Sequence, residues 1–115
     1  MTVGKKTFRL VTFEKPDGND ETQEQVIKLY EGGAAGYVSA YIRRTAGTGE
    51  GYVEVYGTFK SEPTDDDLYE LNSYWWDDSL NYFMDGYYNE FPYLAVRCYP
   101  DDTNPFTVEV YFSGF

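Results

Sequence analysis

Apolar and polar residues alternate in four short segments of the chain, a pattern typical of half-buried β-strands. The first two segments are residues 36–41 and 51–56, and the last two are residues 93–99 and 106–112. A glycine-rich loop joins the first two, and a loop bounded by two prolines joins the last two. We therefore predict two antiparallel β-hairpins in one sheet.

Alternation along these strands predicts one aliphatic face and one tyrosine-rich face. The residues expected to point inward are mostly aliphatic: Val38, Ala40, Ile42, Val53, Val55, Phe59, Leu94, Val96, Cys98, Phe106, Val108, Val110 and Phe112. The residues expected to point outward include most of the tyrosines: Tyr37, Ser39, Tyr41, Arg43, Tyr52, Glu54, Tyr56, Thr58, Tyr93, Arg97, Tyr99, Glu109 and Tyr111.

The amino-terminal part of the chain holds one clear strand and one ambiguous segment. Residues 6–15 predict a strand that stops at the turn formers of residues 16–19. Residues 20–31 can be a helix, capped by Thr22 and Gln25, or a strand that returns in a hairpin. The helix is favoured, because Glu, Gln, Lys and Leu dominate the segment and it lacks alternation.

Residues 64–89 predict a long amphipathic helix. Thr64 follows a proline and is a good N-cap, and three aspartates occupy the first turn. At about 100° per residue the apolar side chains gather in one stripe that would cover the aliphatic face of the sheet. This stripe comprises Leu68, Leu71, Trp75, Trp76, Leu80, Tyr82, Phe83 and Tyr87.

These elements predict a single α+β domain over residues 1–115. Its antiparallel sheet would have four or five strands, with the long helix on one face. If residues 20–31 form a second short helix, the order of elements approaches a ferredoxin-like sandwich with an added strand.

Charge is distributed unevenly along the chain, which has a formal net charge of −11. Residues 1–60 carry eight acidic and eight basic side chains, whereas residues 61–115 carry twelve acidic side chains and one base, Arg97. A field of one sign repels nucleic acid and anionic membranes and attracts basic partners. We therefore expect no direct nucleic-acid binding, no membrane association and a basic protein partner.

The composition excludes many catalytic classes. With no histidine and one cysteine, Cys98, the chain has no Ser-His or Cys-His pair and no internal disulfide. Neither acidic cluster, residues 17–20 or residues 65–67, has the ligand spacing of a calcium-binding loop. The adjacent Asp77 and Asp78 would point about 100° apart on a helix. We expect a non-enzymatic protein without metal or cofactor. A free cysteine, no long apolar run and no signal-peptide core predict the cytoplasm.

On the predicted helix, acidic side chains form a ridge opposite the apolar stripe. From Asp67 to Asp85 the helix would rise about 27 Å, over which one DNA strand presents about eight phosphates. The acidic ridge comprises Asp66, Asp67, Glu70, Asp77, Asp78 and Asp85. Such a line of carboxylates can occupy a cationic DNA-binding or RNA-binding channel.

In size and charge pattern the chain is similar to DNA-mimic inhibitors, with which phages and mobile elements block restriction or CRISPR nucleases. This resemblance implies an anti-restriction or anti-CRISPR inhibitor whose partner is a basic nucleic-acid-binding protein or nuclease complex. The alternative is a cytoplasmic interaction or homodimerisation module that uses the tyrosine face, unless other segments cover it. The aromatic contact residues would be Tyr37, Tyr41, Tyr52, Tyr56, Trp76, Tyr99 and Tyr111.

Overall fold

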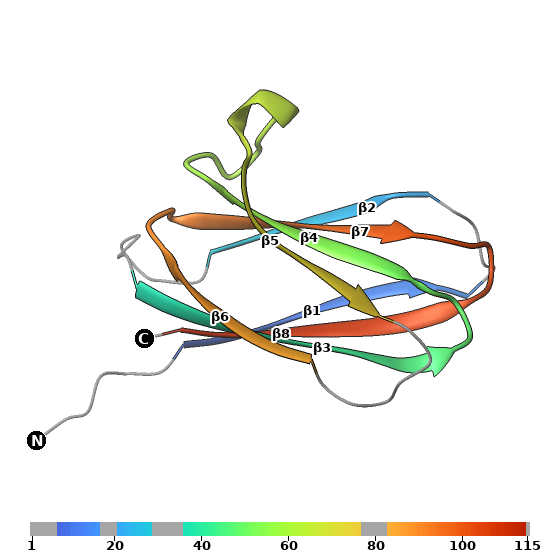
Figure 1. The fold of residues 1–115 in the computed structure, drawn as a ribbon. Coiled ribbons are helices and arrows are strands. Elements are labelled where there is room, and N and C mark those ends of the chain that lie inside the picture. The colour runs from blue at the N-terminus through green and yellow to red at the C-terminus, as the bar shows by residue number, and fades with distance from the viewer. Residues whose placement is uncertain (1–6, 17–20, 29–35, 77–82, 115) are drawn as a thin grey trace, which may run out of the picture.

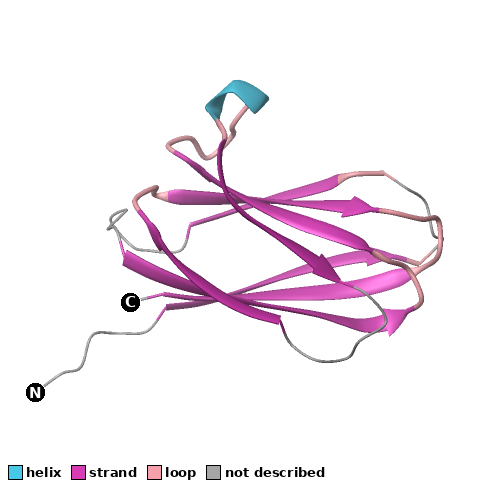
Figure 2. Ribbon diagram, in the orientation of Figure 1, coloured by secondary structure: helices cyan, strands magenta, loops and turns pink. Residues whose placement is uncertain are grey.

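Antiparallel strands dominate the computed structural model, which describes residues 7–16, 21–28, 36–76 and 83–114 (Figure 1). The strands are β1 (Thr7–Lys15), β2 (Gln23–Lys28), β3 (Gly36–Gly47), β4 (Gly51–Thr58), β5 (Tyr69–Trp76), β6 (Phe83–Asn89), β7 (Tyr93–Pro100) and β8 (Phe106–Gly114). Within the described residues, the helical structure is one 3-10 turn, η2 (Asp65–Asp67), as Figure 2 shows.

The strands form two four-stranded sheets, ordered β1-β8-β3-β6 and β2-β7-β4-β5, that pack face to face (Figure 1). Their pairings are nested: β4 pairs with β5, β3 with β6, β2 with β7 and β1 with β8, all antiparallel. The chain therefore folds back on itself around the connection between β4 and β5. Eight strands in two sheets with this order form a jelly-roll sandwich.

The core lies between the sheets, and the alternation along the strands predicts most of it. Inward hydrophobic residues of β3, β4, β7 and β8 are at most 2% exposed. β1 contributes Val11 and Phe13, which are fully buried. Confirmed inward residues are Val38, Ala40, Ile42, Val53, Val55, Leu94, Val96, Cys98, Phe106, Val108, Val110 and Phe112.

The long helix predicted over residues 64–89 is wrong, and with it the α+β class. The segment contains η2, then β5, and later β6. In β5 the side chains of Tyr74 and Trp76 are buried, whereas that of Trp75 between them is 49% exposed. This period of two, in a stretch rich in aromatic residues, belongs to a strand. Thr64 is an N-cap as predicted, but the helical structure that it caps is a single 3-10 turn.

The helix favoured for residues 20–31 is also wrong, because β2 occupies residues 23–28. The strand alternative is correct in type but not in pairing. β1 pairs with β8 and β2 with β7, so the two strands belong to different sheets and form no hairpin. The ferredoxin-like order is thereby excluded.

Both predicted hairpins are wrong, although all four of their strands exist. β3 and β4 lie in opposite sheets, and so do β7 and β8. In either arrangement a strand buries the same face, so alternation reveals the buried face but not the neighbouring strand. The glycine-rich segment after β3 crosses between the sheets, where it is held by Pro105, whose carbonyl accepts the N–H groups of Thr48 and Gly49.

Close contacts explain the glycines of this crossing. A Cβ on Gly47, whose φ is +82°, would lie 2.1 Å from the Pro105 carbonyl oxygen. The carbonyl of Gly49 accepts hydrogen bonds from Trp76 Nε1 at 2.9 Å and from Arg44 Nη1 at 3.2 Å. Because Trp76 and Arg44 come from different sheets, their shared acceptor fixes this end of the sandwich.

Two side chains near the end of β4 depart from the predicted faces. Phe59, expected in the core, is 72% exposed, because β4 ends at Thr58 and the chain leaves the sheet there. Thr58, expected outward, is fully buried, and its hydroxyl accepts a hydrogen bond from the N–H of Lys60. This departure marks the start of the connection between β4 and β5.

Candidate binding surface

The described residues of the predicted acidic ridge do not lie on one helix. Asp66 and Asp67 belong to η2, Glu70 lies in β5, and Asp85 lies in β6 of the other sheet. Asp77 and Asp78 lie outside the described residues. The four described residues therefore do not form a single helical line of carboxylates.

The residues of the predicted tyrosine face belong to two different sheets. Tyr52, Tyr56 and Tyr99 belong to the β2-β7-β4-β5 sheet, while Tyr37, Tyr41 and Tyr111 belong to strands of the other sheet. Trp76, predicted as an exposed anchor, is only 3% exposed and packs 5.1 Å from the Phe106 ring centroid. It is a core residue and cannot contact a partner.

Trp75, rather than Trp76, is the exposed tryptophan of β5. In register, Trp75 of β5 faces Tyr52 of β4, which in turn faces Tyr99 of β7. The rings of Trp75 and Tyr52 stack with centroids 6.4 Å apart, and those of Tyr52 and Tyr99 with centroids 4.9 Å apart. We call these three side chains the aromatic row. A helical wheel placed Trp75 in the core, whereas alternation along a strand would have placed it outside.

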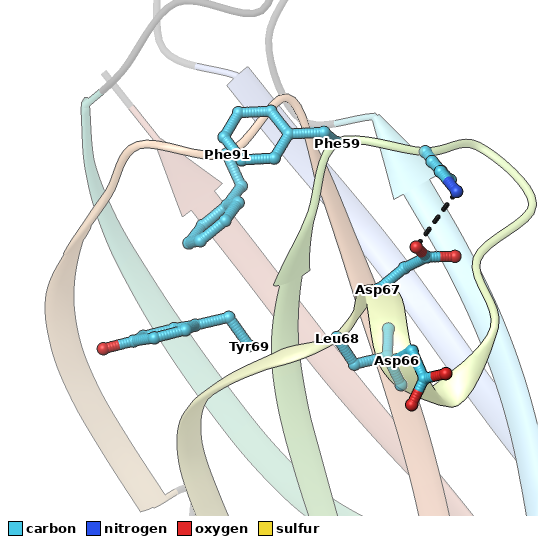
Figure 3. A pocket seen from close by; sticks show the side chains of 7 residues that line it. Phe59, Asp66, Asp67, Leu68, Tyr69 and Phe91 are labelled. Atoms are coloured by element: carbon cyan, nitrogen blue, oxygen red, sulfur yellow. Dashed lines mark ion pairs between the residues drawn. The ribbon is translucent and has the colours of Figure 1, made fainter.

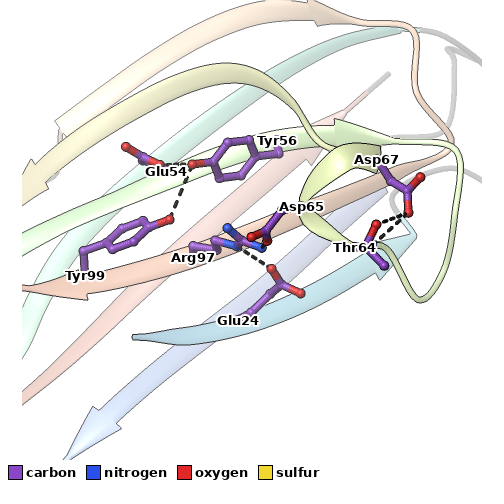
Figure 4. Close-up of polar contacts among 8 residues, drawn as sticks. All are labelled: Glu24, Glu54, Tyr56, Thr64, Asp65, Asp67, Arg97 and Tyr99. Carbon is purple, nitrogen blue, oxygen red and sulfur yellow. Dashed lines mark hydrogen bonds and ion pairs between the residues drawn. The ribbon is translucent and has the colours of Figure 1, made fainter. Parts of the chain in front are cut away.

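A polar network lies beside the aromatic row on the same outer face (Figure 4). Arg97 donates from Nε to Glu24 and from Nη2 to Asp65, each at 2.5 Å, and its guanidinium carbon lies 5.5 Å from the Tyr56 ring centroid. These carboxylates raise the pKa of the Arg97 guanidinium above its ordinary value. The hydroxyl of Tyr56 donates to Glu54.

The surroundings of Arg97 favour its charged form, whereas those of Glu54 disfavour its charged form. Its pKa is raised above the ordinary value of 4.5, first by partial burial and then by the negative charge of Glu70. A hydrogen bond involving Tyr99 and the charge of Arg97 lower it to a smaller extent. Negative charge at this point of the outer face is therefore only partly compensated.

The connection between β4 and β5, residues 59–68, rises beyond the outer face (Figure 1). Asp67 holds it in shape, since its carboxylate accepts hydrogen bonds from the Thr64 N–H at 2.8 Å and the Thr64 hydroxyl at 3.0 Å. The Lys60 ammonium lies 3.0 Å from the same carboxylate. Arg97 ties the connection to β7 through Asp65.

An open hollow of about 340 Å³ lies between this connection and Phe91 (Figure 3). We call it the aromatic hollow, and its lining is Phe59, Lys60, Asp66, Asp67, Leu68, Tyr69 and Phe91. The Phe91 ring centroid lies 5.0 Å from that of Phe59 and 5.6 Å from that of Tyr69. Phe91 packs over Gly57, where a Cβ would come within 2.0 Å of the ring.

Phe59 and Tyr69 are 72% and 64% exposed, the highest values among the exposed large hydrophobic side chains of the described residues. Sequence reasoning missed both, together with Phe91, because it placed Phe59 in the core and assigned Tyr69 to a helix. Two aromatic side chains exposed to this extent at one site are uncommon on a monomer and are typical of an interface.

No protein-family model matches the chain, and no curated protein matches it. Among solved structures, it is similar to part of dimeric latent PorU from Porphyromonas gingivalis, with 12% identity, a TM-score of 0.30, and coverage of 95% of this chain and 13% of that one. It is also similar to part of the structure of the infectious bursal disease virus Gx strain, with 9% identity, a TM-score of 0.27, and coverage of 94% and 32%. At these TM-scores neither likeness supports a conclusion about function.

Two further properties concern the described residues alone. None of their helical structure is long and apolar enough to cross a membrane. Their His, Cys, Asp and Glu side chains form no group of three or more that could hold a metal ion.

Proposed function

We propose that this protein is a non-catalytic module that binds a basic protein through the outer face of the β2-β7-β4-β5 sheet. The observation that carries the proposal is the aromatic row, which ends in the half-exposed Trp75 at the edge strand β5. Aromatic side chains present a large apolar area and lose little conformational entropy when they are immobilised, so they supply much of the binding energy at interfaces.

Charge supports a basic partner rather than a second copy of this chain. Each copy carries a formal net charge of −11, so two copies repel one another at long range. A basic partner is instead attracted, and its association is accelerated. In this proposal the acidic residues steer the encounter, and the aromatic row supplies the short-range contact. The free Cys98 is consistent with a reducing compartment, so the proposal includes a cytoplasmic location.

Inhibition of a nuclease by charge mimicry stays a prediction from the composition. The helix on which this prediction aligned the carboxylates does not occur in the described residues. Two acidic side chains of the connection are also paired with cations, Asp65 with Arg97 and Asp67 with Lys60. A binding module that uses an aromatic face requires no such alignment, which is why the geometry favours it.

The test is capture of a partner from an extract of the source organism, comparing wild type with Trp75→Ala and Leu10→Ala. Leu10 is a matched control, because it is 46% exposed but lies on β1 of the other sheet. We expect recovery to fall at least about tenfold for Trp75→Ala, a hot-spot effect, and to be unchanged for Leu10→Ala. Equal recovery by both variants would contradict the proposal.

Excess duplex DNA, added during capture, separates the two functions. Charge mimicry places the inhibitor in the nucleic-acid channel, so duplex should displace it from the partner. Binding through the aromatic row should survive the duplex. Displacement by duplex together with full recovery by Trp75→Ala would establish mimicry instead.

A further inference from the structure

The outer side of β5 is an open strand edge. β5 is the last strand of the β2-β7-β4-β5 sheet and pairs with β4 on one side (Figure 1). Among the described residues, no strand pairs with it on the other side. An edge of this kind presents unpaired backbone N–H and C=O groups, to which another chain can bind. β5 carries neither proline nor lysine, two residues with which proteins commonly block an exposed edge.

The N–H of Ser73 shows which backbone groups of β5 face the open edge. It donates to Oδ1 of the neighbouring Asn72 at 2.8 Å, so it points away from β4. In an antiparallel strand, the N–H and C=O of every second residue point to the same side, so those of Trp75 also face the open edge. Ser73 and Trp75 are both exposed. The C=O of Ser73 and both backbone groups of Trp75 are therefore placed to pair with another strand.

The opposite edge of the sandwich, formed by β1 and β2, is closed by side chains. There, Gln23 and Gln25 of β2 donate from Nε2 to the backbone carbonyls of Glu14 and Thr12 of β1, at 3.0 Å and 2.7 Å. These bonds occupy carbonyl groups that a further strand would need in order to pair with β1. In the described part of the chain, no such bond covers the backbone of Trp75. The two edges therefore differ, and the one beside the aromatic row is open.

We propose that the basic partner adds an extended segment to the open edge of β5, antiparallel to it, as a fifth strand of this four-stranded sheet. The inference rests on the proposed function, because the segment belongs to the protein that binds the outer face. The residue that pairs with Trp75 would place its side chain beside the Trp75 ring and extend the aromatic row by one strand. In strand addition, main-chain hydrogen bonds supply affinity, and alternate side chains supply specificity.

Charge on the outer face favours a basic residue in the segment, opposite Ser73 and two positions from the residue that pairs with Trp75. In register, Ser73 lies between this position and Glu54 of β4. Two strand spacings amount to about 10 Å, which a lysine or arginine side chain can span together with a glutamate side chain. Partial burial, and then the negative charge of Glu70, raise the pKa of Glu54. A cation at this position would offset the repulsion between the two carboxylates.

The first test is amide hydrogen exchange in the free protein. The amide of Trp75 should exchange rapidly, because it faces the open edge, whereas that of Tyr74, which faces β4, should be protected. Equal protection of the two amides would show that the edge is already covered and would overturn the inference. Protection of Trp75 that grows with protein concentration, together with dimers in sedimentation, would assign the edge to a second copy and overturn it as well.

The second test is NMR titration with a basic peptide, the acetylated and amidated Lys-Thr-Lys-Thr-Trp-Thr-Lys-Thr-Lys. Its lysines and its tryptophan alternate with threonine, so they share one face of an extended strand. We expect shifts centred on Ser73 and Trp75 and protection of the Trp75 amide. The same peptide with glutamate in place of lysine should bind at least about tenfold more weakly. Absence of shifts at Ser73 and Trp75, or equal binding of the two peptides, would overturn the inference.

Two N-methylated forms of the basic peptide separate strand addition from contact through side chains alone. Methyl groups on the amides of the tryptophan and the two nearest lysines block the edge that would pair with β5. Methyl groups on the threonine amides block the opposite edge instead. We expect the first form to bind at least about tenfold more weakly than the second, because main-chain hydrogen bonds are lost. Equal binding of the two forms would overturn the inference.

Ser73→Pro is the corresponding change in the protein, and Ser73→Ala is its control. Proline removes an N–H that takes no part in the pairing with β4, and its ring projects from the open edge. Affinity for the basic peptide should fall at least about tenfold with proline and equal that of wild type with alanine. Equal affinity of the two variants would overturn the inference. Urea unfolding shows whether both variants fold, and the N-methylated peptides decide if Ser73→Pro does not.

Failure of this inference is separate from failure of the proposed function. Loss of partner recovery in Trp75→Ala supports the outer face, even if the Trp75 amide stays unprotected when the peptide is bound.

Discussion

Arg97 of β7 and Asp65 of η2 are joined by an ion pair of 2.5 Å that ties the connection between β4 and β5 to the outer face. The same guanidinium contacts Glu24 of β2 and lies over the ring of Tyr56 in β4. One side chain thus links three strands to the segment that forms the aromatic hollow. Arg97 therefore holds this connection against the outer face of the sheet.

Replacement of Arg97 by Met should loosen this connection. The paired side chains are partly exposed, Arg97 to 21% and Asp65 to 86%, so solvent screens the interaction. We expect a loss of only about 1 kcal/mol in the free energy of unfolding, measured with urea. Amide exchange at Asp67 and Leu68 should become faster, because both N–H groups are bonded within η2. Unchanged exchange at these amides would show that Arg97 does not hold the connection.

The adjacent tryptophans should respond differently to replacement by phenylalanine. Trp76→Phe removes the hydrogen bond to Gly49 and leaves a void beside Phe106, which should cost about 2–3 kcal/mol of unfolding free energy. Trp75→Phe changes a half-exposed side chain and should cost about 0.5 kcal/mol or less. Urea unfolding of both variants measures the difference. Similar losses would contradict the assignment of one residue to the core and the other to the surface.

Asp67 should make stability depend on pH in the acidic range. Hydrogen bonding by the Thr64 N–H, and then by Lys60, lowers the pKa of Asp67 below its ordinary value of 3.8. The ionised form therefore stabilises the fold above that value, and this stabilisation is lost as the pH falls through the lowered pKa. Carboxyl NMR titration measures the pKa directly, and Asp67→Asn should remove this part of the pH dependence. A pKa at or above 3.8 would contradict the cap seen at Thr64.

Cys98 should be unreactive in the folded protein. It is fully buried between the sheets, and burial raises the pKa of its thiol to about 12. Since the thiolate is the nucleophile, labelling by a thiol reagent at neutral pH should proceed only through unfolding. The labelling rate should therefore rise with urea in parallel with the unfolded fraction. Rapid labelling without urea would show that this part of the core opens locally.

The buried faces of the strands could be predicted from the sequence, but their pairing could not. The inward hydrophobic side chains of β3, β4, β7 and β8 follow directly from alternation. Neighbours in the sheet depend on contacts distant in sequence, such as β1 with β8, which no local pattern specifies. Two strands joined by a short glycine-rich loop resembled a hairpin because a crossing between sheets needs similar turn residues.

The error in β5 altered the candidate site most. The capping residues at Thr64 and the aspartates after it are real signals, but they serve a single turn. Extending them into a helix placed Trp75 in the core and brought six acidic residues into one line. With a period of two, the same residues put Trp76 inside and Trp75 outside, and the aromatic row follows.

The most direct test of the outer face as the binding surface is site-specific photo-crosslinking in cells of the source organism. The photoreactive amino acid p-benzoyl-phenylalanine replaces Trp75 in one sample and Leu10 in another, so each sheet is probed at a half-exposed position. We predict a discrete crosslinked product with a basic protein from position 75 and none from position 10. Products of equal yield at both positions, or a product from position 10 alone, would contradict binding through the β2-β7-β4-β5 sheet.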